Sequence, residues 1–596
     1  RLQNQYQPRE YCVQYRETDL NFISRLLEEE GIFYFFEHSE DNHLLVFGDS
    51  AVNYQPIEGP QNKEKQVEIK FHPPDALVPE EESVQAFAFS RQIRSGKVTL
   101  RDFNFAKPSL DLTAQKQADS YQKLEVYDYP GEYLEQERGK KLADIRLQEA
   151  VVFTDKAEGQ SVCPRFIPGF TFKLTGHQIS TFDDEYLLIE VIHTGSQPQT
   201  LEQRAGGEFV YNNQFLAIPS AVTLRPERNT PKPIVEGVQT AIVTGPAGEE
   251  IYTDEHGRVK VQFHWDREGK RDEKSSCWIR VSQLWAGENW GAIYIPRIGH
   301  EVVVDFVEGD PDRPIITGRV YHGTNKPPYK LPDEKTKSTI KSKTTPGGKT
   351  HNELLMEDKN GKTQVVLSNA YGHKITEDEE SQSLTIETRD KHTIKLDDKN
   401  KNISIQTTNA HSISMNDTDT RGEGTISVQT TNGNRVEMDD KNEKMTAQTT
   451  NGHTLLFDDK NKKVELVTTD GHSAVLSDDE QKISITSTKG HYITIDDPGD
   501  SITLEDSSGM HRFKIDIGGS KLVISTDTGS IELEAPSGSI SLKATEIDID
   551  AQMELKMKGG MNVTSEAGLQ HTTKGTMVTT QSSAANTIKG TPVMIN

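Results

Sequence analysis

The chain has 596 residues, which is long enough for several domains. Lys and Arg number 67 against 92 Asp and Glu, and the net charge of −25 makes nucleic acid and anionic membrane surfaces poor partners. The three cysteines, Cys12, Cys163 and Cys277, form no CxxC pair, which argues against a disulfide framework or a zinc site and fits folding in a reducing cytoplasm. The sequence contains neither an apolar run that could span a bilayer nor a signal-peptide pattern. Since the sequence that predicts folded structure begins close to Arg1, we expect the natural N-terminus to lie upstream.

Residues 1–230 predict a mixed α+β domain. Its first element is a helix over 18–31, which Thr18 or Asp19 caps and Gly31 ends. The carboxylates of Glu28–Glu30 point to different sides of that helix, so we interpret them as an exposed charged turn rather than a catalytic group. The other elements expected here are a hairpin of residues 32–36 with 44–47, a second helix at 139–150 and a buried strand at 186–193.

Residues 231–330 contain about five short strands separated by turns, which fits a small Greek-key barrel of the OB type. Such barrels often bind single-stranded nucleic acid through basic and aromatic faces, but the acidic balance of the chain argues against that ligand here. Residues 331–372 would form a linker or the start of a needle. Three histidines in turn contexts are interpreted as structural rather than metal-binding, namely His256, His264 and His300.

A repeat of fixed length occupies residues 373–596. Apolar residues fall two, four, eleven and thirteen positions after the first residue of each copy, which predicts two short strands with one buried face. Asp, Asn and Gly between the strands tolerate the dihedral angles of tight turns. Copies begin every 19 residues in two series, which a four-residue insertion near 421–424 separates: His373, His392 and His411, then Asn434, His453, His472 and His491.

Two apolar residues per strand make a core too thin for one chain to fold alone. We therefore expect several copies to wind together, with each strand paired to a neighbouring chain and the apolar residues facing the axis. Three copies would close a prism on the order of 100 Å long, a rigid object without a pocket and with a mechanical role. The residues expected to fill its core are Ile394, Leu396, Leu455, Phe457, Val464, Leu466, Ile493, Ile495, Ile502 and Leu504.

The repeated His shares the alternation of the inward positions, so three copies of His453, for example, could meet at one level and bind an anion or a metal. A corner His that is hydrogen-bonded to a neighbouring turn explains the same pattern, and we favour that interpretation. Gly347–Thr350 ends like a phosphate-binding loop but lacks its first glycine. The sequence also contains no HExxH or GxSxG motif. We therefore expect no enzyme activity and no cofactor.

Parts of all three segments resemble the VgrG family, the trimeric spikes of the bacterial type VI secretion system, which are similar to the hub-and-spike proteins of contractile phage tails. The resemblance implies a mainly β fold: an α+β tail-hub domain over 1–230 that lacks its first residues, an OB barrel over 231–330, and a triple-stranded β-helix over 373–596. The stretches that carry it are residues 18–47, 254–266, 290–321 and the ladder that ends in Val593–Asn596.

The resemblance also implies a function and partners. A homotrimer would cap a tube of Hcp rings, pass through a target-cell membrane when a sheath contracts, and carry effector or toxin proteins. It would assemble in the bacterial cytoplasm and then be secreted or translocated into the target cell. Family members resembling this chain carry a PAAR-repeat protein on the tip, where the end of the prism would expose strand edges and apolar side chains. The residues expected to bind it are Ile588, Thr591, Pro592, Val593, Met594, Ile595 and Asn596.

Other functional classes remain open at this point. One is a monomeric β-solenoid that acts on polysaccharide as an enzyme or serves as an adhesin, and another is a calcium-binding repeat protein. Against the enzyme, no carboxylate cluster recurs together with a set of aromatic residues that could line a groove. Against the calcium-binding protein, the turns lack the Gly-Gly-x-Gly-x-Asp pattern. The mass in solution distinguishes these classes, because a spike requires three copies.

Overall fold

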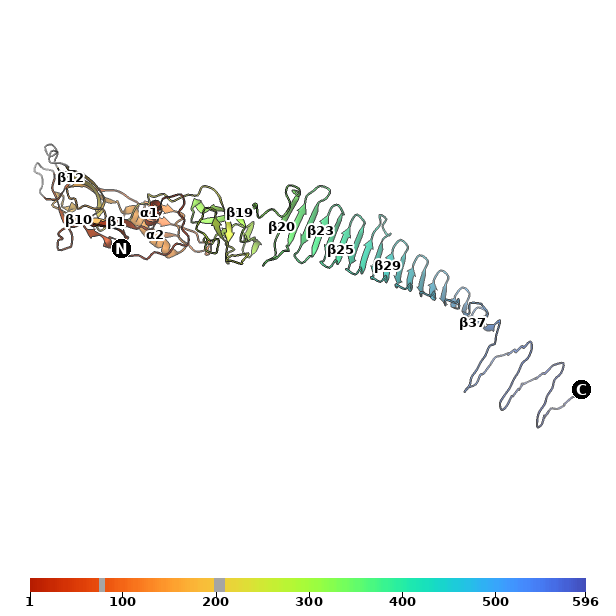
Figure 1. Ribbon diagram of the computed structural model, residues 1–596. Helices are drawn as coiled ribbons and strands as arrows, with labels where there is room; N and C mark the ends of the chain where they lie inside the picture. Colours follow the sequence, from red (N-terminus) through yellow and green to blue (C-terminus); the bar gives the residue numbers. More distant parts are fainter. Residues whose placement is uncertain (74–80, 198–208, 596) are drawn as a thin grey trace. The chain divides into compact units, whose positions relative to one another are not determined.

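The computed structural model describes residues 1–73, 81–197 and 209–595 (Figure 1). The chain divides into two compact units, Arg1–His373 and Lys374–Asn596. Strands dominate both units, and the α-helices of the described residues belong to the first. The predicted fold class is confirmed: the chain is mainly β, with an α+β part, a small OB-type barrel and a long repetitive ladder.

The α+β part of the first unit precedes residue 220. Its helices and strands are α1 (Asp19–Glu30), β1 (Phe33–His38), β2 (His43–Gly48), β3 (Gln55–Pro56), β4 (Glu68–Phe71), β5 (Ser83–Arg91), β6 (Lys97–Leu100), β7 (Ala114–Gln117), β8 (Glu125–Asp128), α2 (Gln136–Val151), β9 (Asp155–Ser161), β10 (Phe170–Thr175), β11 (Glu185–Ser196) and β12 (Val210–Pro219). Short 3-10 turns lie at Ala51–Asn53 and Ser180–Phe182.

The first helix has the ends that its sequence predicts. The Thr18 hydroxyl accepts a hydrogen bond from the backbone N–H of Asn21 at 3.2 Å, which satisfies one free donor of the first turn. Gly31 ends the helix with a left-handed φ of 68°, a conformation that favours glycine. The predicted hairpin is confirmed as β1 and β2, and the second helix is confirmed as α2, which is longer than expected at both ends.

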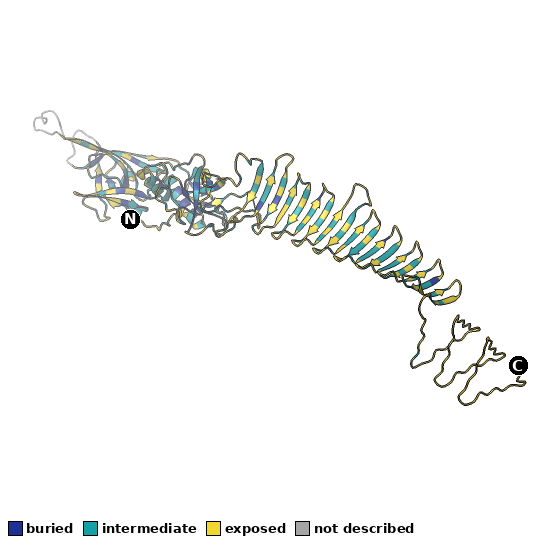
Figure 2. Ribbon diagram, turned by 45° about the vertical axis from the view of Figure 1, so that its right-hand side comes forward, coloured by how far each residue is buried: buried dark blue, intermediate teal, exposed yellow. Residues whose placement is uncertain are grey.

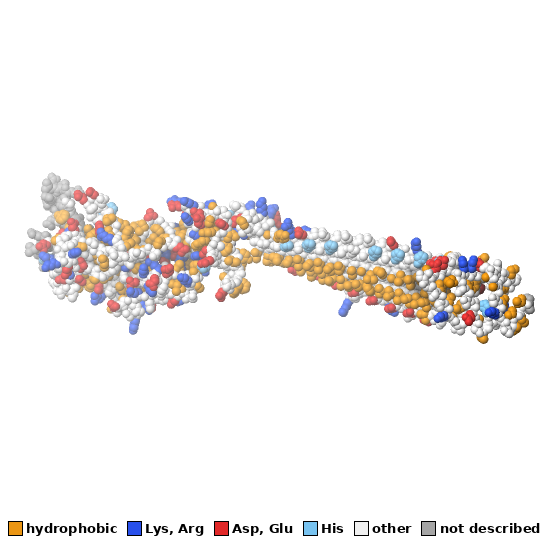
Figure 3. Space-filling model, turned by 90° about the horizontal axis from the view of Figure 1, so that it is seen from below, with side chains coloured by type: hydrophobic (Ala, Val, Ile, Leu, Met, Phe, Trp, Pro, Cys, Tyr) orange, Lys and Arg blue, Asp and Glu red, His pale blue; other side chains and the backbone are white. Residues whose placement is uncertain are grey.

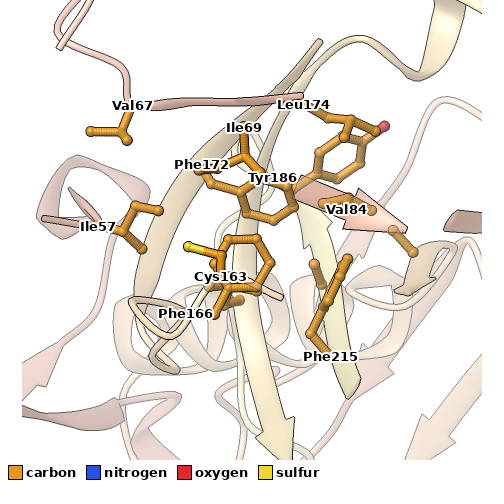
Figure 4. Close-up of a cluster of buried hydrophobic side chains, with 13 residues drawn as sticks. Ile57, Val67, Ile69, Val84, Cys163, Phe166, Phe172, Leu174, Tyr186 and Phe215 are labelled. Carbon is orange, nitrogen blue, oxygen red and sulfur yellow. The ribbon is translucent and has the colours of Figure 1, made fainter. Parts of the chain in front are cut away.

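A seven-stranded sheet in the order β11-β12-β9-β5-β4-β10-β3 holds the main core of this part. Rings of Phe166, Phe172, Tyr186 and Phe215 pack together inside it (Figure 4). The ring centroids of Phe166 and Phe172 lie 4.6 Å apart, a distance typical of favourable aromatic pairs. The predicted buried strand at 186–193 is correct for its first half only, because β11 becomes exposed from Ile192 onward as it extends beyond the core.

The OB-type barrel follows, and its inner face is lined by apolar side chains such as Val243, Val261 and Val302. The strand order is β14-β13-β18-β19-β15, and a bridge between Val259 and Ile279 joins the two outer strands, so the barrel is closed. Its strands, with the exposed pair β16 and β17, are β13 (Gln239–Thr244), β14 (Lys260–Phe263), β15 (Arg280–Val281), β16 (Trp285–Gly287), β17 (Trp290–Ala292), β18 (Glu301–Phe306) and β19 (Pro314–Val320), with a 3-10 turn at Val307–Gly309.

The ladder consists of short strands that follow one another in chain order. The first unit contributes β20 (Lys337–Lys341), β21 (Glu353–Glu357) and β22 (Gln364–Ser368). The second unit contains β23 (Lys374–Asp378), β24 (Ser383–Glu387), β25 (Thr393–Asp397), β26 (Asn402–Gln406), β27 (Ser412–Asn416), β28 (Thr425–Gln429), β29 (Arg435–Asp439), β30 (Lys444–Gln448), β31 (Thr454–Asp458), β32 (Lys463–Val467), β33 (Ser473–Ser477), β34 (Lys482–Thr486), β35 (Tyr492–Asp496), β36 (Ser501–Glu505), β37 (His511–Asp516) and β38 (Lys521–Thr526).

The expected pairing of each strand with a neighbouring chain is wrong for this ladder. From β23 to β38, each strand pairs antiparallel with the next strand of the same chain, as in the register Leu455 opposite Leu466 and Phe457 opposite Val464. The physical reason is the connection, because a loop of only a few residues turns the chain straight back and an antiparallel neighbour forms at once. The backbone hydrogen bonds of the ladder are therefore made within the chain.

Two kinds of turn alternate along the ladder. In the first, the Asp458 carboxylate accepts hydrogen bonds from the backbone N–H and the side-chain amide of Asn461, at 3.0 and 2.9 Å. In the second, the Thr449 hydroxyl accepts from the backbone N–H of His453 at 3.1 Å, and Gly452 takes a φ of 91°. The polar residues between the predicted strands thus close the turns through their own side chains.

The ladder was expected to continue to the C-terminus, but its strands end with β38. The described residues 527–595 contain no helix or strand, and Figure 1 draws them as a zigzag. Apolar alternation persists there, for example at Ile531 and Leu533 and again nine residues later at Ile540 and Leu542. A spacing of nine leaves room for one strand per copy instead of an outgoing and a returning strand, so this segment offers no antiparallel neighbour of its own.

Candidate functional site

One face of the ladder carries the apolar residues of every repeat, and we call it the apolar face. Alternation within each strand places Leu455 and Phe457 on the same side, and their cross-strand neighbours Leu466 and Val464 lie there too. Figure 3 shows the result as a continuous band of hydrophobic side chains, and Figure 2 shows exposed positions repeating strand after strand. Leu466 is 51% exposed, so the apolar face is open to solvent in a single chain.

The structure brings together the residues predicted to form the core. Ile394 and Leu396 lie opposite Ile405 and Ile403, and the other predicted positions repeat this arrangement further along the ladder. None of the ten is classed as buried within the chain, and Ile493 is 42% exposed. Large continuous apolar surfaces on soluble proteins mark interaction sites, so the assignment to a core between copies stays a prediction. Those residues are Ile394, Leu396, Leu455, Phe457, Val464, Leu466, Ile493, Ile495, Ile502 and Leu504.

The opposite face of the ladder is polar. Thr494, which lies between Ile493 and Ile495 in β35, has Ser484 and Thr503 as its cross-strand neighbours. Hydroxyl groups on this side can hydrogen-bond to water, whereas the apolar face gains free energy when it leaves water. The ladder is therefore an amphipathic sheet whose apolar side needs a partner surface.

Five of the six repeated histidines, those from His392 to His491, are hydrogen-bonded at the corners of the ladder, which confirms the favoured interpretation for them. In each contact the ring Nδ1 accepts from the backbone N–H of a residue in the next repeat, as His453 does from Thr469 at 3.2 Å. The described residues contain no group of three or more His, Cys, Asp and Glu side chains arranged to hold a metal ion. The other contacts of this kind are Thr408 to His392, Thr431 to His411, Thr488 to His472 and Ser507 to His491.

The predicted tip residues lie in the zigzag segment without strands. Ile588, Val593, Met594 and Ile595 are exposed, and Met594 is 85% exposed. Thr591 and Pro592 are exposed as well, whereas Asn596 lies outside the described residues. Within the described residues up to 595 none of these side chains is buried, so their role at the tip stays a prediction.

The barrel histidines do not come together. His256 packs its ring against Phe105, with 5.3 Å between ring centroids, and the ring Nε2 of His264 is hydrogen-bonded to the Thr240 hydroxyl at 2.9 Å. Burial lowers the pKa of His300, whose ring Nδ1 accepts from the backbone N–H of Arg297. Each ring has a separate contact, which agrees with structural roles.

The carboxylates of Glu28–Glu30 are half-buried and bonded rather than an exposed charged turn, so that interpretation is wrong. Glu28 accepts hydrogen bonds from the backbone N–H and hydroxyl of Thr230 at 2.9 and 2.7 Å. Glu29 pairs with Arg9 at 2.9 Å, and Glu30 pairs with both Arg9 and Arg138. Their partners are distant in sequence, so sequence spacing gave no signal for them. These contacts fix α1 against the rest of the first unit.

The segment resembling a phosphate loop is occupied by a protein contact. The backbone N–H of Gly347 donates to the Glu250 carboxylate at 2.9 Å, so a negative group already lies where a phosphate would bind.

Among the described helices, none is long and apolar enough to cross a membrane.

Two families of known proteins match the chain. Residues 1–199 match the phage tail baseplate hub (GPD), and residues 241–321 match the type VI secretion system/phage-baseplate injector OB domain. The first match covers α1, α2 and most strands of the seven-stranded sheet, and the second covers the closed barrel.

Relatives of known name are similar to this chain. The type VI secretion system spike protein VgrG4b of Pseudomonas aeruginosa is 43% identical over 379 residues, which are 61% of this chain and 46% of the relative. The actin cross-linking toxin VgrG1 of Vibrio cholerae is 41% identical over 367 residues, or 60% of this chain and 32% of the relative. The chain thus spans about half or less of the length of these relatives. Among solved structures, the Escherichia coli c3393 protein, a component of the type VI secretion system, is 22% identical with a TM-score of 0.35, covering 54% of this chain and 65% of that chain.

The two family matches follow each other along the chain in the order of the hub part and the barrel of the structure. Five Pseudomonas aeruginosa relatives at 39–43% identity are spike proteins of the type VI secretion system, whereas the Vibrio cholerae relative at 41% is an actin cross-linking toxin. The chain is therefore similar to VgrG spike proteins of the type VI secretion system, and it contains a baseplate-hub match followed by an injector OB-domain match.

Proposed function

We propose that the chain is a structural spike of the type VI secretion system and acts as a homotrimer. The observation that carries the proposal is the apolar face, which runs along the ladder on the side opposite the polar face. Three copies that turn this face toward a common axis would bury the predicted core residues and leave the polar face in water. A monomeric solenoid or adhesin would leave the same surface exposed, which disfavours that alternative.

The zigzag segment after β38 supports the same assembly. Its backbone N–H and C=O groups have no ladder within the described chain, while alternating apolar residues such as Ile547 and Ile549 persist. Strands that lack a partner in their own chain pair with another chain when one is available. We infer that residues 527–595 wind around the equivalent segments of two other copies, so the expectation of pairing between chains applies here rather than to β23–β38.

The partners follow from the proposed spike. The hub part would cap a tube of Hcp rings, the barrel would connect it to the needle, and the tip would carry a PAAR-repeat protein together with effectors. The boundaries between these parts are proposed at residues 230, 330 and 372. The spike would assemble in the bacterial cytoplasm and pass into a target cell on sheath contraction, and its role is mechanical rather than enzymatic.

The test is a pull-down from secreting cells with a tagged chain. We expect Hcp and a PAAR-repeat protein to co-purify with the full chain. Deleting residues 591–596 should abolish capture of the PAAR-repeat protein, since those residues form the proposed tip, and should leave the trimer and the Hcp contact intact because they lie outside the ladder. A truncated chain that still captures the PAAR-repeat protein would refute the tip assignment. A full chain that brings down neither partner would refute the spike.

A further inference from the structure

The two long edges of the ladder differ chemically, and the proposed trimer makes them meet. We call the turns that contain the repeated His or Asn the His edge, for example residues 449–453, and the turns at the other ends of the strands the Asp edge, for example residues 458–462. In a closed ring of three parallel copies, each contact is heterologous, so the His edge of one copy adjoins the Asp edge of the next. The inference below rests on that proposed trimer.

The His edge presents a row of fixed hydrogen-bond donors. Because Nδ1 of His453 accepts from the backbone of Thr469, the neutral ring carries its proton on Nε2. No hydrogen bond or ion pair involves Nε2 of these five corner rings within the described part of the chain. Asn434 replaces His at one level, and its side-chain oxygen accepts from the backbone N–H of Thr450 at 2.9 Å. The amide N–H₂ of Asn434 therefore takes the place of the Nε2–H of the histidines. Each of the six repeats thus has one side-chain acceptor that binds its own chain and one side-chain donor that is available to another copy.

The Asp edge presents a matching row of free acceptors. An Asp lies six positions after the His or Asn in each of six successive repeats, an offset that strand alternation alone does not single out. These carboxylates have no ion pair or side-chain hydrogen bond within residues 374–595, and Lys462 pairs with the adjacent Asp479 at 3.2 Å instead of with Asp478. The six residues are Asp398, Asp417, Asp440, Asp459, Asp478 and Asp497.

Both rows border the apolar face. His453 and Asp459 flank the same strand, β31, and they continue the alternation of Leu455 and Phe457 at its two ends. Figure 3 shows the histidines as a row beside the hydrophobic band. Hollows of about 420 and 400 Å³ lie along the His edge, the first bounded by Asn434, His453 and Leu455, so the edge has room for side chains of another copy.

We propose that the His edge of one copy binds the Asp edge of the next through a six-level ladder of hydrogen bonds. At each level one donor binds one of the six Asp carboxylates of the neighbouring copy. The donors are the amide N–H₂ of Asn434 and the Nε2–H of His392, His411, His453, His472 and His491. Cyclic symmetry keeps the copies level, so His453 meets Asp459 of the next copy, or the Asp one repeat away if the strands are inclined to the axis.

This contact supplies what the apolar face lacks, a register. Every strand of the ladder offers a similar apolar pair, so apolar packing alone tolerates a slip of one copy by one strand. The His and Asp rows recur only every second strand, and a slip by one strand would leave both the donors and the carboxylates unpaired. The edges therefore exclude alignments in which one copy is shifted by one strand along the needle.

The test is cysteine cross-linking of the full chain. A His453→Cys/Asp459→Cys double variant should form covalent dimers and trimers on a non-reducing gel, whereas each single variant should give no cross-link. Pairs of His453→Cys with Asp440→Cys or Asp478→Cys examine the neighbouring repeats. The parent chain, with its free Cys12, Cys163 and Cys277, is the control for background.

The outcomes separate this inference from the proposed trimer. A protein with the mass of three chains in which none of the three pairs cross-links would overturn the edge contact but not the spike. Cross-linking of a single variant would mean that like edges meet, and it would overturn the contact as well. A protein with the mass of one chain would overturn the trimer itself.

A second measurement separates the donor from mere packing. His453→Asn should leave the urea midpoint of trimer dissociation unchanged, because Asn434 already fills the same place in another repeat. His453→Leu removes both the Nε2–H donor and the acceptor of the Thr469 N–H, so it should lower that midpoint more in the parent chain than in an Asp459→Ala background. Equal decreases in the two backgrounds would contradict the proposed hydrogen bond.

Discussion

An aspartate in place of Ile493 tests whether the apolar face is the inside of the assembled needle. Ile493 lies in β35, with Leu504 and Ile485 as its cross-strand neighbours on the apolar face. Thr494→Asp is the matched control, because it introduces the same side chain one residue further along the same strand, on the polar face between Ser484 and Thr503.

The expected cost follows from the exposure of the two positions. Full burial of an Ile side chain is worth about 1.5–3 kcal/mol, so the 42% of Ile493 that is exposed in one chain represents about 0.6–1.3 kcal/mol per copy in the trimer. A carboxylate buried without a partner adds several kcal/mol per copy, and three copies at one level bring the total to the order of 10 kcal/mol. The control should change the free energy of unfolding by about 0.5 kcal/mol or less.

Thermal unfolding and hydrogen exchange measure the difference. Ile493→Asp should lower the melting temperature of the trimer by several degrees or more, and should speed amide exchange in β34–β36, where the ladder would open. Thr494→Asp should resemble the parent in both measurements. Equal melting temperatures for the two variants would refute the assignment of the apolar face to the trimer core.

Three further predictions concern single contacts. Burial raises the pKa of Asp312 to about 6, so the charged carboxylate destabilises the fold above that pH. Asp312→Asn removes this charge and should raise the free energy of unfolding at pH 8 by about 1–2 kcal/mol. The amide oxygen can still accept from the backbone N–H of Val13, and melts at pH 4, where the Asp312 carboxyl is protonated in the fold, should show a much smaller difference. Hydrogen bonds from Asn461 lower the pKa of Asp458. The resulting stabilisation is present above the ordinary pKa and is lost as pH falls through the lowered one, so Asp458→Ala should lower the melting temperature more at pH 7 than at acidic pH. Thr18→Ala should cost about 1 kcal/mol in urea unfolding through loss of the helix cap, and no change would contradict that contact.

Periodicity predicted which side chains share a face, but not which backbone they pair with. The offsets of Leu455, Phe457, Val464 and Leu466 follow directly from strand alternation, and the structure confirms that they lie side by side. Alternation is the same whether the neighbouring strand belongs to the same chain or to another one. The short turn at Asp458, which folds the chain back on itself, was visible in the sequence and should have decided the question.

The histidine rows illustrate a second limit. A His at fixed spacing predicted a repeated contact, and the contact with the next turn is confirmed, as between His472 and Thr488. Which ring nitrogen is used depends on where the backbone N–H of the next repeat lies, and that requires the fold. The partners of Glu28–Glu30 were out of reach for the same reason, because Thr230 and Arg138 are distant in sequence.

The mass of the full chain in solution tests the central claim most directly. Sedimentation equilibrium should give about 200 kDa, three times the 66.8 kDa chain, at concentrations where the ladder is folded. A folded protein with the mass of a single chain would contradict the account, because its apolar face would then be stable in water without a partner.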